Sequence, residues 1–325
     1  MKRELQNVEI PGEYDARRRT WEIVRAAFDE RERVAWPRRH LRELVLVAAA
    51  VVVLAAVLTP PGRSVVDSVR RTIGVQHAQR ELVRLPAPGR LLVDSARGTW
   101  IVQSNGSRRL LGPYHEPAWS PHGLFVGAVS NRRELVALDP KGNVRWVKPE
   151  RRVVRSPRWS YEGYRIAYFA GPTLRVINGD GTGARSIGPA DPAVPPAWRP
   201  GTHEIAYALH GKPQVVDVDT LMRLRAGPAD RRRLFAAVPP NGGPVARVET
   251  RRGRSFVVVG SQQVFAGSGR LRGVAWSPNG KWLAVSWPDA DQLVFVRVHG
   301  KPKLIAVSNI AGELGSSPSL GGWSR

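Results

Sequence analysis

The chain has 325 residues, and its 50 Lys and Arg outnumber its 27 Asp and Glu to give a formal net charge of +23 at pH 7. It contains no Cys, which excludes disulfides, thiolate catalysis and Cys-ligated metals. The length allows one domain of about 240 residues with a separate N-terminal part. A field of this sign attracts anions such as lipid headgroups or wall polyphosphates; the alternative is that the scattered Arg side chains are simply solvated.

Residues 1–40 are predicted to be a cytoplasmic segment containing one amphipathic helix. Apolar residues recur on one face of the stretch 13–34 at helical spacing: Tyr14, Trp21, Val24 and Phe28. The opposite face carries both signs of charge. The helix is therefore expected to lie on anionic lipid, to bind a cytoplasmic partner through residues 14–28, or to be a solvated helix beside the membrane.

Residues 41–60 are predicted to form a transmembrane helix. The run 44–58 has no polar side chain, and with Thr59 it is about 24 Å long as a helix, so Leu41 and the snorkelling Arg42 are needed to cross the hydrocarbon core. More than forty residues precede it, which disfavours a cleaved signal peptide. Six Arg precede the run closely and three follow it: Arg25, Arg31, Arg33, Arg38, Arg39 and Arg42, then Arg63, Arg70 and Arg71. This bias predicts a cytoplasmic N-terminus.

Residues 61–87 are predicted to connect this anchor to the next domain. A capping box at Ser64 and Asp67 precedes Val65, Val69 and Ile73, and Gly74 ends the pattern. We expect a short stalk helix followed by a Pro-rich linker.

A repeat occupies residues 88–325. The copies read Trp119-Ser-Pro-His-Gly, Trp159-Ser-Tyr-Glu-Gly, Trp198-Arg-Pro-Gly and Trp276-Ser-Pro-Asn-Gly, each followed by an apolar run. The steps between the Trp residues are 40, 39 and 78 residues. Because 78 is twice 39, one copy has lost its Trp. Aligning Gly253 with Gly280 puts Glu249 at that position, and we expect this copy to be the least stable.

Each copy fits one antiparallel sheet of four strands, because Pro and Gly supply the turn after Trp and alternating strands follow. In the second copy these strands are 165–169, 173–178 and 185–187. Units of this length stack radially into a propeller. Strands 90–93, 99–103 and 108–111 have no Trp strand before them, and Trp323 has no strands after it. Pairing the two ends closes an all-β propeller of six blades.

These copies resemble the Trp-Ser-Pro-Asp-Gly-Lys-x-Ile-Ala repeats of TolB-type propellers, also called WD40-like repeats. The chain departs from that pattern at the Asp position, where it has His122, Glu162, Thr202 and Asn279. Trp119, Trp159, Trp198, Trp276 and Trp323 are then structural repeat residues. The resemblance implies partner binding far more often than chemistry.

Catalytic motifs are lacking in the sequence. No Gly-x-Ser-x-Gly, phosphate-binding loop or His-Glu-x-x-His occurs. The Gly-rich stretch 179–183 is interpreted as a hairpin turn, and the His pairs have no carboxylates at ligand spacing. We expect no metal, no cofactor and no enzymatic activity; the alternative is an extracytoplasmic hydrolase with its active site in the propeller channel.

Basic residues recur near the inner strand of several copies. Four residues before Trp stand His115, Arg155 and Arg272, and Arg247 precedes Glu249 by two. Because the Trp strand is innermost in a propeller, these four residues are predicted to meet at the channel mouth and bind an anion there. The alternative is that they stack on Trp or pair with Glu116.

The sequence thus predicts a single-pass protein of the cell membrane with its N-terminus in the cytoplasm and its propeller outside. The propeller is expected to act as a non-enzymatic binding or sensing module for a protein, an anionic cell-surface polymer or a lipid, and nucleic acid is not expected as a partner. The sequence does not identify the ligand, the oligomeric state or a signal across the membrane.

Overall fold

A computed structural model describes residues 84–240 and 242–325. The predicted cytoplasmic helix, transmembrane helix and stalk helix lie outside these residues. Within the described part, no helix is long and apolar enough to cross a membrane.

The described residues form six antiparallel sheets, numbered here in chain order. The first contains β23 (Ser319–Ser324), β1 (Arg90–Ser95), β2 (Gly98–Gln103) and β3 (Arg108–Gly112). The second contains β4 (His115–Trp119), β5 (Val126–Ser130), β6 (Glu134–Leu138) and β7 (Val144–Pro149). The third contains β8 (Val154–Trp159), β9 (Arg165–Ala170), β10 (Thr173–Asn178) and β11 (Arg185–Pro189).

The other three sheets follow the same order of strands. The fourth contains β12 (Ala197–Trp198), β13 (Glu204–Leu209), β14 (Lys212–Asp217) and β15 (Arg223–Leu224). The fifth has only β16 (Ala246–Arg251), β17 (Arg254–Val259) and β18 (Gln262–Ser268). The sixth contains β19 (Val274–Trp276), β20 (Trp282–Trp287), β21 (Gln292–Arg297) and β22 (Lys303–Ser308). Short helices are α4 (Pro228–Phe235), α5 (Ile310–Leu314), η1 (Pro121–Gly123) and η2 (Pro288–Ala290).

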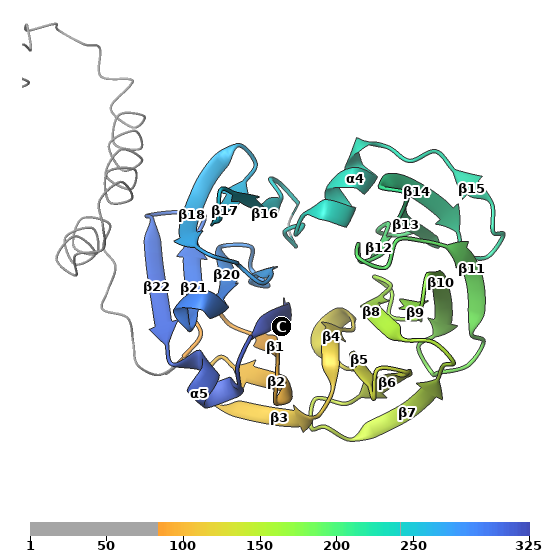
Figure 1. Cartoon of the computed structure of the whole chain (residues 1–325), viewed down its shortest axis with the longest axis horizontal. Helices are drawn as coiled ribbons and strands as arrows, with labels where there is room; N and C mark the ends of the chain where they lie inside the picture. Colours follow the sequence, from red (N-terminus) through yellow and green to blue (C-terminus); the bar gives the residue numbers. More distant parts are fainter. Residues whose placement is uncertain (1–83, 241) are drawn as a thin grey trace, which may run out of the picture. The chain divides into compact units, whose positions relative to one another are not determined.

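The sheets lie side by side around a common centre, near which the C-terminus ends (Figure 1). The first strands of neighbouring sheets contact one another, as β4 does with β8 and β23, and as β19 does with β23. The described part is therefore all-β with propeller-like sheets, as the repeat predicts. The strands predicted in the second copy are confirmed as β9, β10 and β11.

The last strand of the chain belongs to the first sheet. β23 pairs antiparallel with β1, with Trp323 opposite Leu91 and Ser324 opposite Arg90. Gly89 makes this approach possible, because it has φ of +113° and a Cβ there would lie 2.2 Å from the Ser324 carbonyl oxygen. The two ends of the repeat region therefore share one sheet.

The repeat Trp residues fill the spaces between sheets. Each ends or nearly ends a first strand and packs in a cluster of apolar residues drawn from its own sheet and the preceding one. The clusters contain Trp119 between the first and second sheets, Trp159 between the second and third, Trp198 between the third and fourth, Trp276 between the fifth and sixth, and Trp323 between the sixth and first. Burial of such large apolar groups is the main stabilising contribution here.

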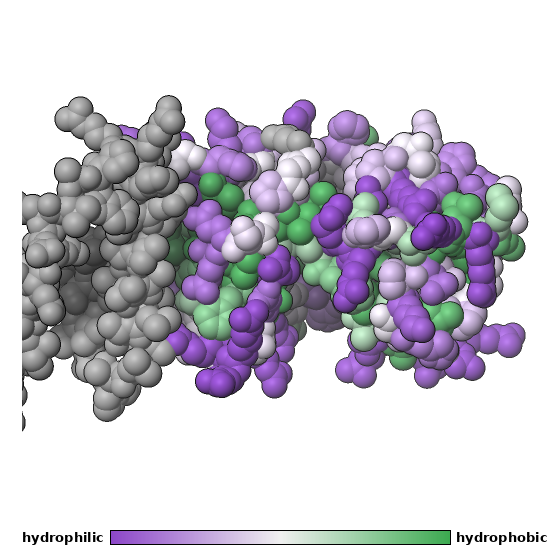
Figure 2. Space-filling model, turned by 90° about the horizontal axis from the view of Figure 1, so that it is seen from above, coloured by the Kyte–Doolittle hydropathy of each residue, from purple (hydrophilic) through white to green (hydrophobic). Residues whose placement is uncertain are grey.

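The exception is the space between the fourth and fifth sheets. Glu249 of β16 replaces Trp there, opposite Phe256, and no described apolar cluster joins these two sheets. Instead Leu234 of α4 packs on the fourth sheet, while Ala237 bridges to Ala246 of the fifth. We call this space the seam. Figure 2 looks onto the edge of the molecule where these sheets lie and shows apolar surface exposed among polar side chains.

Candidate functional site

Two of the four residues predicted at the channel mouth have carboxylate partners. His115 Nδ1 lies 3.0 Å from Asp94 Oδ1. The Arg247 Nε donates to Glu249 Oε1 at 2.6 Å, and its Nη1 donates to the Gly260 carbonyl at 2.7 Å. The charge of Arg247 is thus largely compensated within its own sheet.

The other two predicted residues are exposed. Arg155 of β8 and Arg272, just before β19, have no side-chain partner among the described residues. No described contact joins any two of the four, so a shared anion site at the channel mouth stays a prediction.

A pocket of about 570 Å³ opens along the seam. Its walls come from the third to sixth sheets and from the chain around α4. Besides Arg158, Tyr161, Arg233 and Arg247, it is lined by Trp159, Pro195, Pro196, Ala197, Trp198, Leu234, Phe235, Ala236, Ala237, Val238, Ala246, Val248, Leu271, Gly273 and Val274. Most of the lining side chains are apolar, but polar groups make up roughly half of the exposed wall, and its ionisable side chains are three Arg and one Tyr. The volume of the pocket is in the range of small-ligand sites.

Arg158 is the unusual group of this pocket. It is half-buried on β8, and its Nη1 donates to the carbonyl of the adjacent Pro157 at 2.8 Å. No carboxylate hydrogen-bonds to it in the described part of the chain. Burial lowers the pKa of Arg158 below its ordinary value, and the charge of nearby Glu116 offsets this only in part. The guanidinium therefore has donors left over for another acceptor.

The sequence contains a signal for this residue that the repeat analysis did not use. The residue before each Trp is small in the other copies: Ala118, Ala197, Ala275 and Gly322. Arg158 alone breaks this pattern before Trp159. A large cation at an inner position that elsewhere holds a small side chain indicates a local requirement for charge, since burying it is costly.

Glu116 cannot serve as a full partner for Arg158. Its carboxylate accepts the backbone N–H of Ser156 at 2.7 Å, across from β4 to β8. This bond satisfies one carboxylate oxygen with a backbone donor. The charge of Glu116 therefore acts on Arg158 only through space.

Arg233 and α4 form the outer side of the pocket. Arg233 Nη1 lies 3.3 Å from Asp230 Oδ1, but Asp230 is held mainly by Arg199, whose Nε and Nη2 donate to its two oxygens at 2.8 and 2.7 Å. The hydrogen bonds from Arg199 lower the pKa of the buried Asp230 despite its burial. Asp230 thus fixes α4 against the fourth sheet, which positions Arg233 and Phe235 at the seam.

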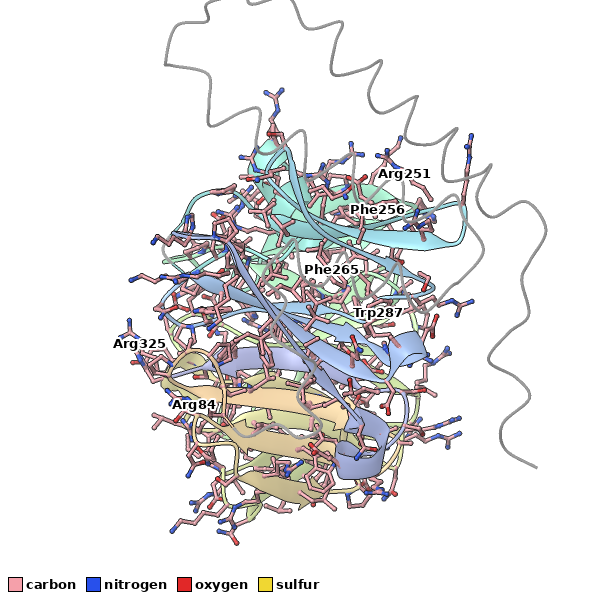
Figure 3. All side chains as sticks on the ribbon, turned by 90° about the vertical axis from the view of Figure 1, so that its left-hand side faces the viewer. Arg84, Arg251, Phe256, Phe265, Trp287 and Arg325 are labelled. Atoms are coloured by element: carbon pink, nitrogen blue, oxygen red, sulfur yellow. The ribbon has the colours of Figure 1, made fainter. Side chains whose placement is uncertain are left out.

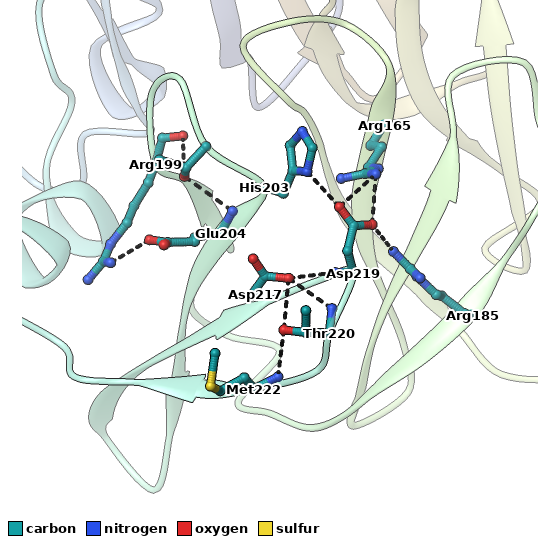
Figure 4. Close-up of polar contacts among 10 residues, drawn as sticks. Arg165, Arg185, Arg199, His203, Glu204, Asp217, Asp219, Thr220 and Met222 are labelled. Atoms are coloured by element: carbon teal, nitrogen blue, oxygen red, sulfur yellow. Dashed lines mark hydrogen bonds and ion pairs between the residues drawn. The ribbon is translucent and has the colours of Figure 1, made fainter.

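A second pocket, of about 670 Å³, lies over the turns that follow Trp159 and Trp198 and includes Arg165 and His203. Its cations share one carboxylate, Asp219. Asp219 accepts hydrogen bonds from Arg165 and Arg185 at 2.8 and 2.9 Å, and His203 lies 2.6 Å from it (Figure 4). Burial raises the pKa of Asp219, but these hydrogen bonds outweigh it and keep the pKa below its ordinary value. This cluster fastens the third sheet to the fourth, so its cations already have a structural partner.

Groups of three or more metal-ligating side chains do not occur in residues 84–240 and 242–325. The described part of the seam pocket's wall also contains no Asp, Glu, His, Ser, Thr or Lys. Its polar groups can bind and orient an anion, but they include no general base or activated nucleophile that works near neutral pH.

Comparisons with known proteins support the fold. No protein-family model and no curated protein matches this sequence. A chain of the nidogen/laminin complex is 12% identical, with a TM-score of 0.50 over 72% of this chain and 97% of that one. TolB from Acinetobacter baumannii is 16% identical, with a TM-score of 0.49 over 72% of this chain and 67% of that one.

A third similar structure is hydrazine synthase from Kuenenia stuttgartiensis, 14% identical with a TM-score of 0.40. The match covers 59% of this chain and 65% of that one, just under two thirds of its length. At such identities the likeness is one of fold alone.

Proposed function

We propose that this protein is a non-enzymatic binding module, in which the seam pocket holds an anionic group attached to an apolar body. One observation carries this proposal: Arg158 is a half-buried cation in the wall of the seam pocket, and no carboxylate of the described residues is hydrogen-bonded to it. A carboxylate suits this site best, because its two oxygens match the planar donors of a guanidinium.

The rest of the pocket supports the same ligand class. Exposed apolar side chains such as Phe235 and Val238, 47% and 42% accessible, can be covered by an apolar body. Arg233 adds a second positive charge at the rim. The missing Trp of the fifth sheet explains why this space is open, since Glu249 turns to Arg247 and Arg251 instead of filling it.

The setting of the module is part of the proposal. Five of the six pairs of neighbouring sheets contact through their first strands, the fourth and fifth sheets are connected by the Ala237–Ala246 bridge, and β23 lies in the first sheet; these features support a closed ring of six blades. The apolar run 44–58 and the Arg bias around it support a membrane anchor with the propeller outside the cytoplasm. A protein partner with an acidic, apolar segment is the natural source of the ligand.

Binding is tested with the full chain in nanodiscs of uncharged lipid. The probe is the peptide acetyl-Leu-Leu-Val-Phe with a free carboxylate, and its control is the same peptide with a C-terminal amide. Calorimetry should detect binding of the acid only. Arg158→Gln should weaken that binding by about 10-fold or more, because a charged hydrogen bond contributes about 1.5 to 3 kcal/mol.

Arg151→Gln is the matched control, since Arg151 lies just before the same strand and is exposed. The Arg151→Gln protein should bind the peptide as tightly as the unchanged protein. If the amide binds as well as the acid, or if Arg151→Gln weakens binding more than Arg158→Gln, the seam pocket is not the site.

The topology is tested by adding protease to intact cells. The propeller should be cleaved while an epitope placed before residue 40 is spared, because the basic flank keeps the N-terminus inside. Cleavage of the N-terminal epitope with a protected propeller would reverse the proposed orientation.

A further inference from the structure

The fifth sheet lacks the fourth, outer strand that the other described sheets have. Every other sheet in the described part has four strands, whereas here β18 pairs with β17 and with no other strand. After β18 the chain passes directly to β19 of the sixth sheet. The backbone N–H and C=O groups on the outer side of β18 therefore have no ladder partner among residues 84–240 and 242–325.

The side chains of β18 do not protect this edge. Natural edge strands carry charges that discourage pairing with another strand. The outer strands of the other sheets follow this rule: Arg108 and Arg109 in β3, Arg145 and Lys148 in β7, Arg185 in β11, Arg223 in β15, and Lys303 in β22. β18 reads Gln-Gln-Val-Phe-Ala-Gly-Ser and has no charged residue.

Positive charge gathers beside one end of β18. Ser268, its last residue, lies opposite Arg254 of β17. Three further Arg are close in sequence to these two residues: Arg251, Arg252 and Arg270. Figure 3 shows this side of the molecule, with Arg251, Phe256, Phe265 and Trp287 labelled.

The neighbouring acids compensate only part of this charge. Glu249 is shared between Arg247 and Arg251, and Asp289 accepts the backbone N–H of Arg270 at 2.8 Å. Arg252 and Arg254 have no side-chain hydrogen bond or ion pair among the described residues.

Side-chain packing against Trp287 holds β18 in place. Phe265 packs edge-on against Trp287 at 5.5 Å between ring centres, and the Trp287 Nε1 donates to the Ser268 carbonyl at 2.8 Å. Gly267 lies flat on the same Trp ring, where a Cβ would come within 2.9 Å of it. Residues 265–268 of β18 are thus held in place, which lowers the entropic cost of adding a strand there. The register of β18 on β17 shifts at Val264, next to this part.

We propose that β18 binds an extended acidic segment of a partner protein, which adds to the fifth sheet as its fourth strand. Backbone hydrogen bonds to β18 supply the affinity, and the Arg group at the Ser268 end selects acidic side chains. A second copy of this chain fits less well, because its net charge of +23 repels another copy. This site lies outside the seam pocket and does not depend on Arg158.

The test uses the full chain in nanodiscs of uncharged lipid and a fluorescent peptide, acetyl-(Val-Glu)₄-amide. Fluorescence anisotropy should show saturable binding. The peptide (Val-Lys)₄ should not bind, and a (Val-Glu)₄ peptide with N-methyl groups on alternate residues should bind at least about 10-fold more weakly, because it cannot complete a ladder. Equal binding of the N-methylated peptide would overturn the proposal.

Variants locate the site. Arg254→Gln with Arg270→Gln should weaken binding by about 10-fold at low salt and flatten its salt dependence. Arg132→Gln with Arg151→Gln removes the same charge from exposed positions elsewhere and should change little. If both pairs weaken binding equally, only the overall field attracts the peptide, and the β18 site is wrong.

Hydrogen exchange can locate the bound peptide on the unchanged protein. The peptide should slow exchange of the amides in 262–268 and leave the other outer strands unchanged. Protection that grows with protein concentration in the absence of peptide would identify a second copy as the occupant and overturn the proposal. Because Arg158→Gln should leave this protection intact, failure here is separate from failure of the seam pocket.

Discussion

The carboxylate of Glu116 accepts a hydrogen bond from the backbone N–H of Ser156 at 2.7 Å, and this bond joins the first strands of two neighbouring sheets. Both residues have positive φ, 50° and 52°, at the irregular point of their strands. The Glu116 N–H is in turn bound by Asp94 of the preceding sheet at 2.9 Å. Carboxylates thus satisfy backbone donors that the strand irregularities leave free.

We expect Glu116→Ala to lower the free energy of unfolding by about 1.5 to 3 kcal/mol, because the Ser156 N–H loses a charged acceptor. Urea unfolding of the full chain measures this. The exposed Glu162 serves as the control, and Glu162→Ala should cost less than about 0.5 kcal/mol. Equal losses for the two variants would show that the bond between the sheets contributes nothing.

The pairing of β23 with β1 is tested at Gly89. Gly89→Ala should be strongly destabilising, because the new Cβ would collide with the Ser324 carbonyl oxygen and separate the two strands. Gly201 also has positive φ, of +67°, but has open space around it. Gly201→Ala therefore measures the backbone strain alone, about 1 kcal/mol, and Gly89→Ala should lower the melting temperature clearly more.

Similar melting temperatures for these two variants would mean that the contact of β1 with β23 adds little to stability. The ring would then hold together through the other interfaces between sheets.

Asp230 gives the protein a pH-dependent contribution to stability. Hydrogen bonds from Arg199 lower its folded pKa below the ordinary value of 3.8. A carboxyl group with a depressed folded pKa stabilises the fold above its unfolded pKa, and this stability is lost as the pH falls through the folded pKa. Asp230→Asn should therefore lower stability at about pH 7, and the difference from the unchanged protein should shrink below about pH 4.

Urea unfolding at about pH 7 and about pH 3 measures this difference. A gap that stays constant across this range would assign the loss to packing of the Asn side chain and not to the charge of Asp230.

The Trp period could predict the sheets because each Trp has one steric role, which is to fill the space between two sheets. The same period located Glu249 in place of the missing Trp. It could not predict α4, because 228–235 has no apolar face of its own and is held by Asp230 and Leu234 through contacts distant in sequence.

The candidate site was predictable only in part. Arg247 was named from its place before Glu249, and the structure puts it in the seam pocket. Arg158 was missed because the copies were compared at the residue four positions before each Trp. The informative residue was the one directly before Trp. Arg233 comes from the insertion that has no counterpart in other copies, so no repeat comparison could reveal it.

Filling the seam should make the protein more stable and lower its affinity for the peptide. Glu249→Trp tests both effects. A Trp at this position should pack between the fourth and fifth sheets as the other repeat Trp residues do in their own interfaces. Burying the ring contributes about 1 to 2 kcal/mol and should raise the melting temperature by roughly 2 to 6 °C. The lost ion pairs with Arg247 and Arg251 lie near the surface and cost little.

The same substitution should weaken binding of the peptide that has a free carboxylate, because the Trp ring would narrow the pocket beside Arg158. Glu249→Gln is the matched control, since it removes the charge without filling the space, and it should leave both the melting temperature and the peptide affinity nearly unchanged. A Glu249→Trp protein that is no more stable, yet binds the peptide normally, would show that the missing Trp is not what keeps the seam open.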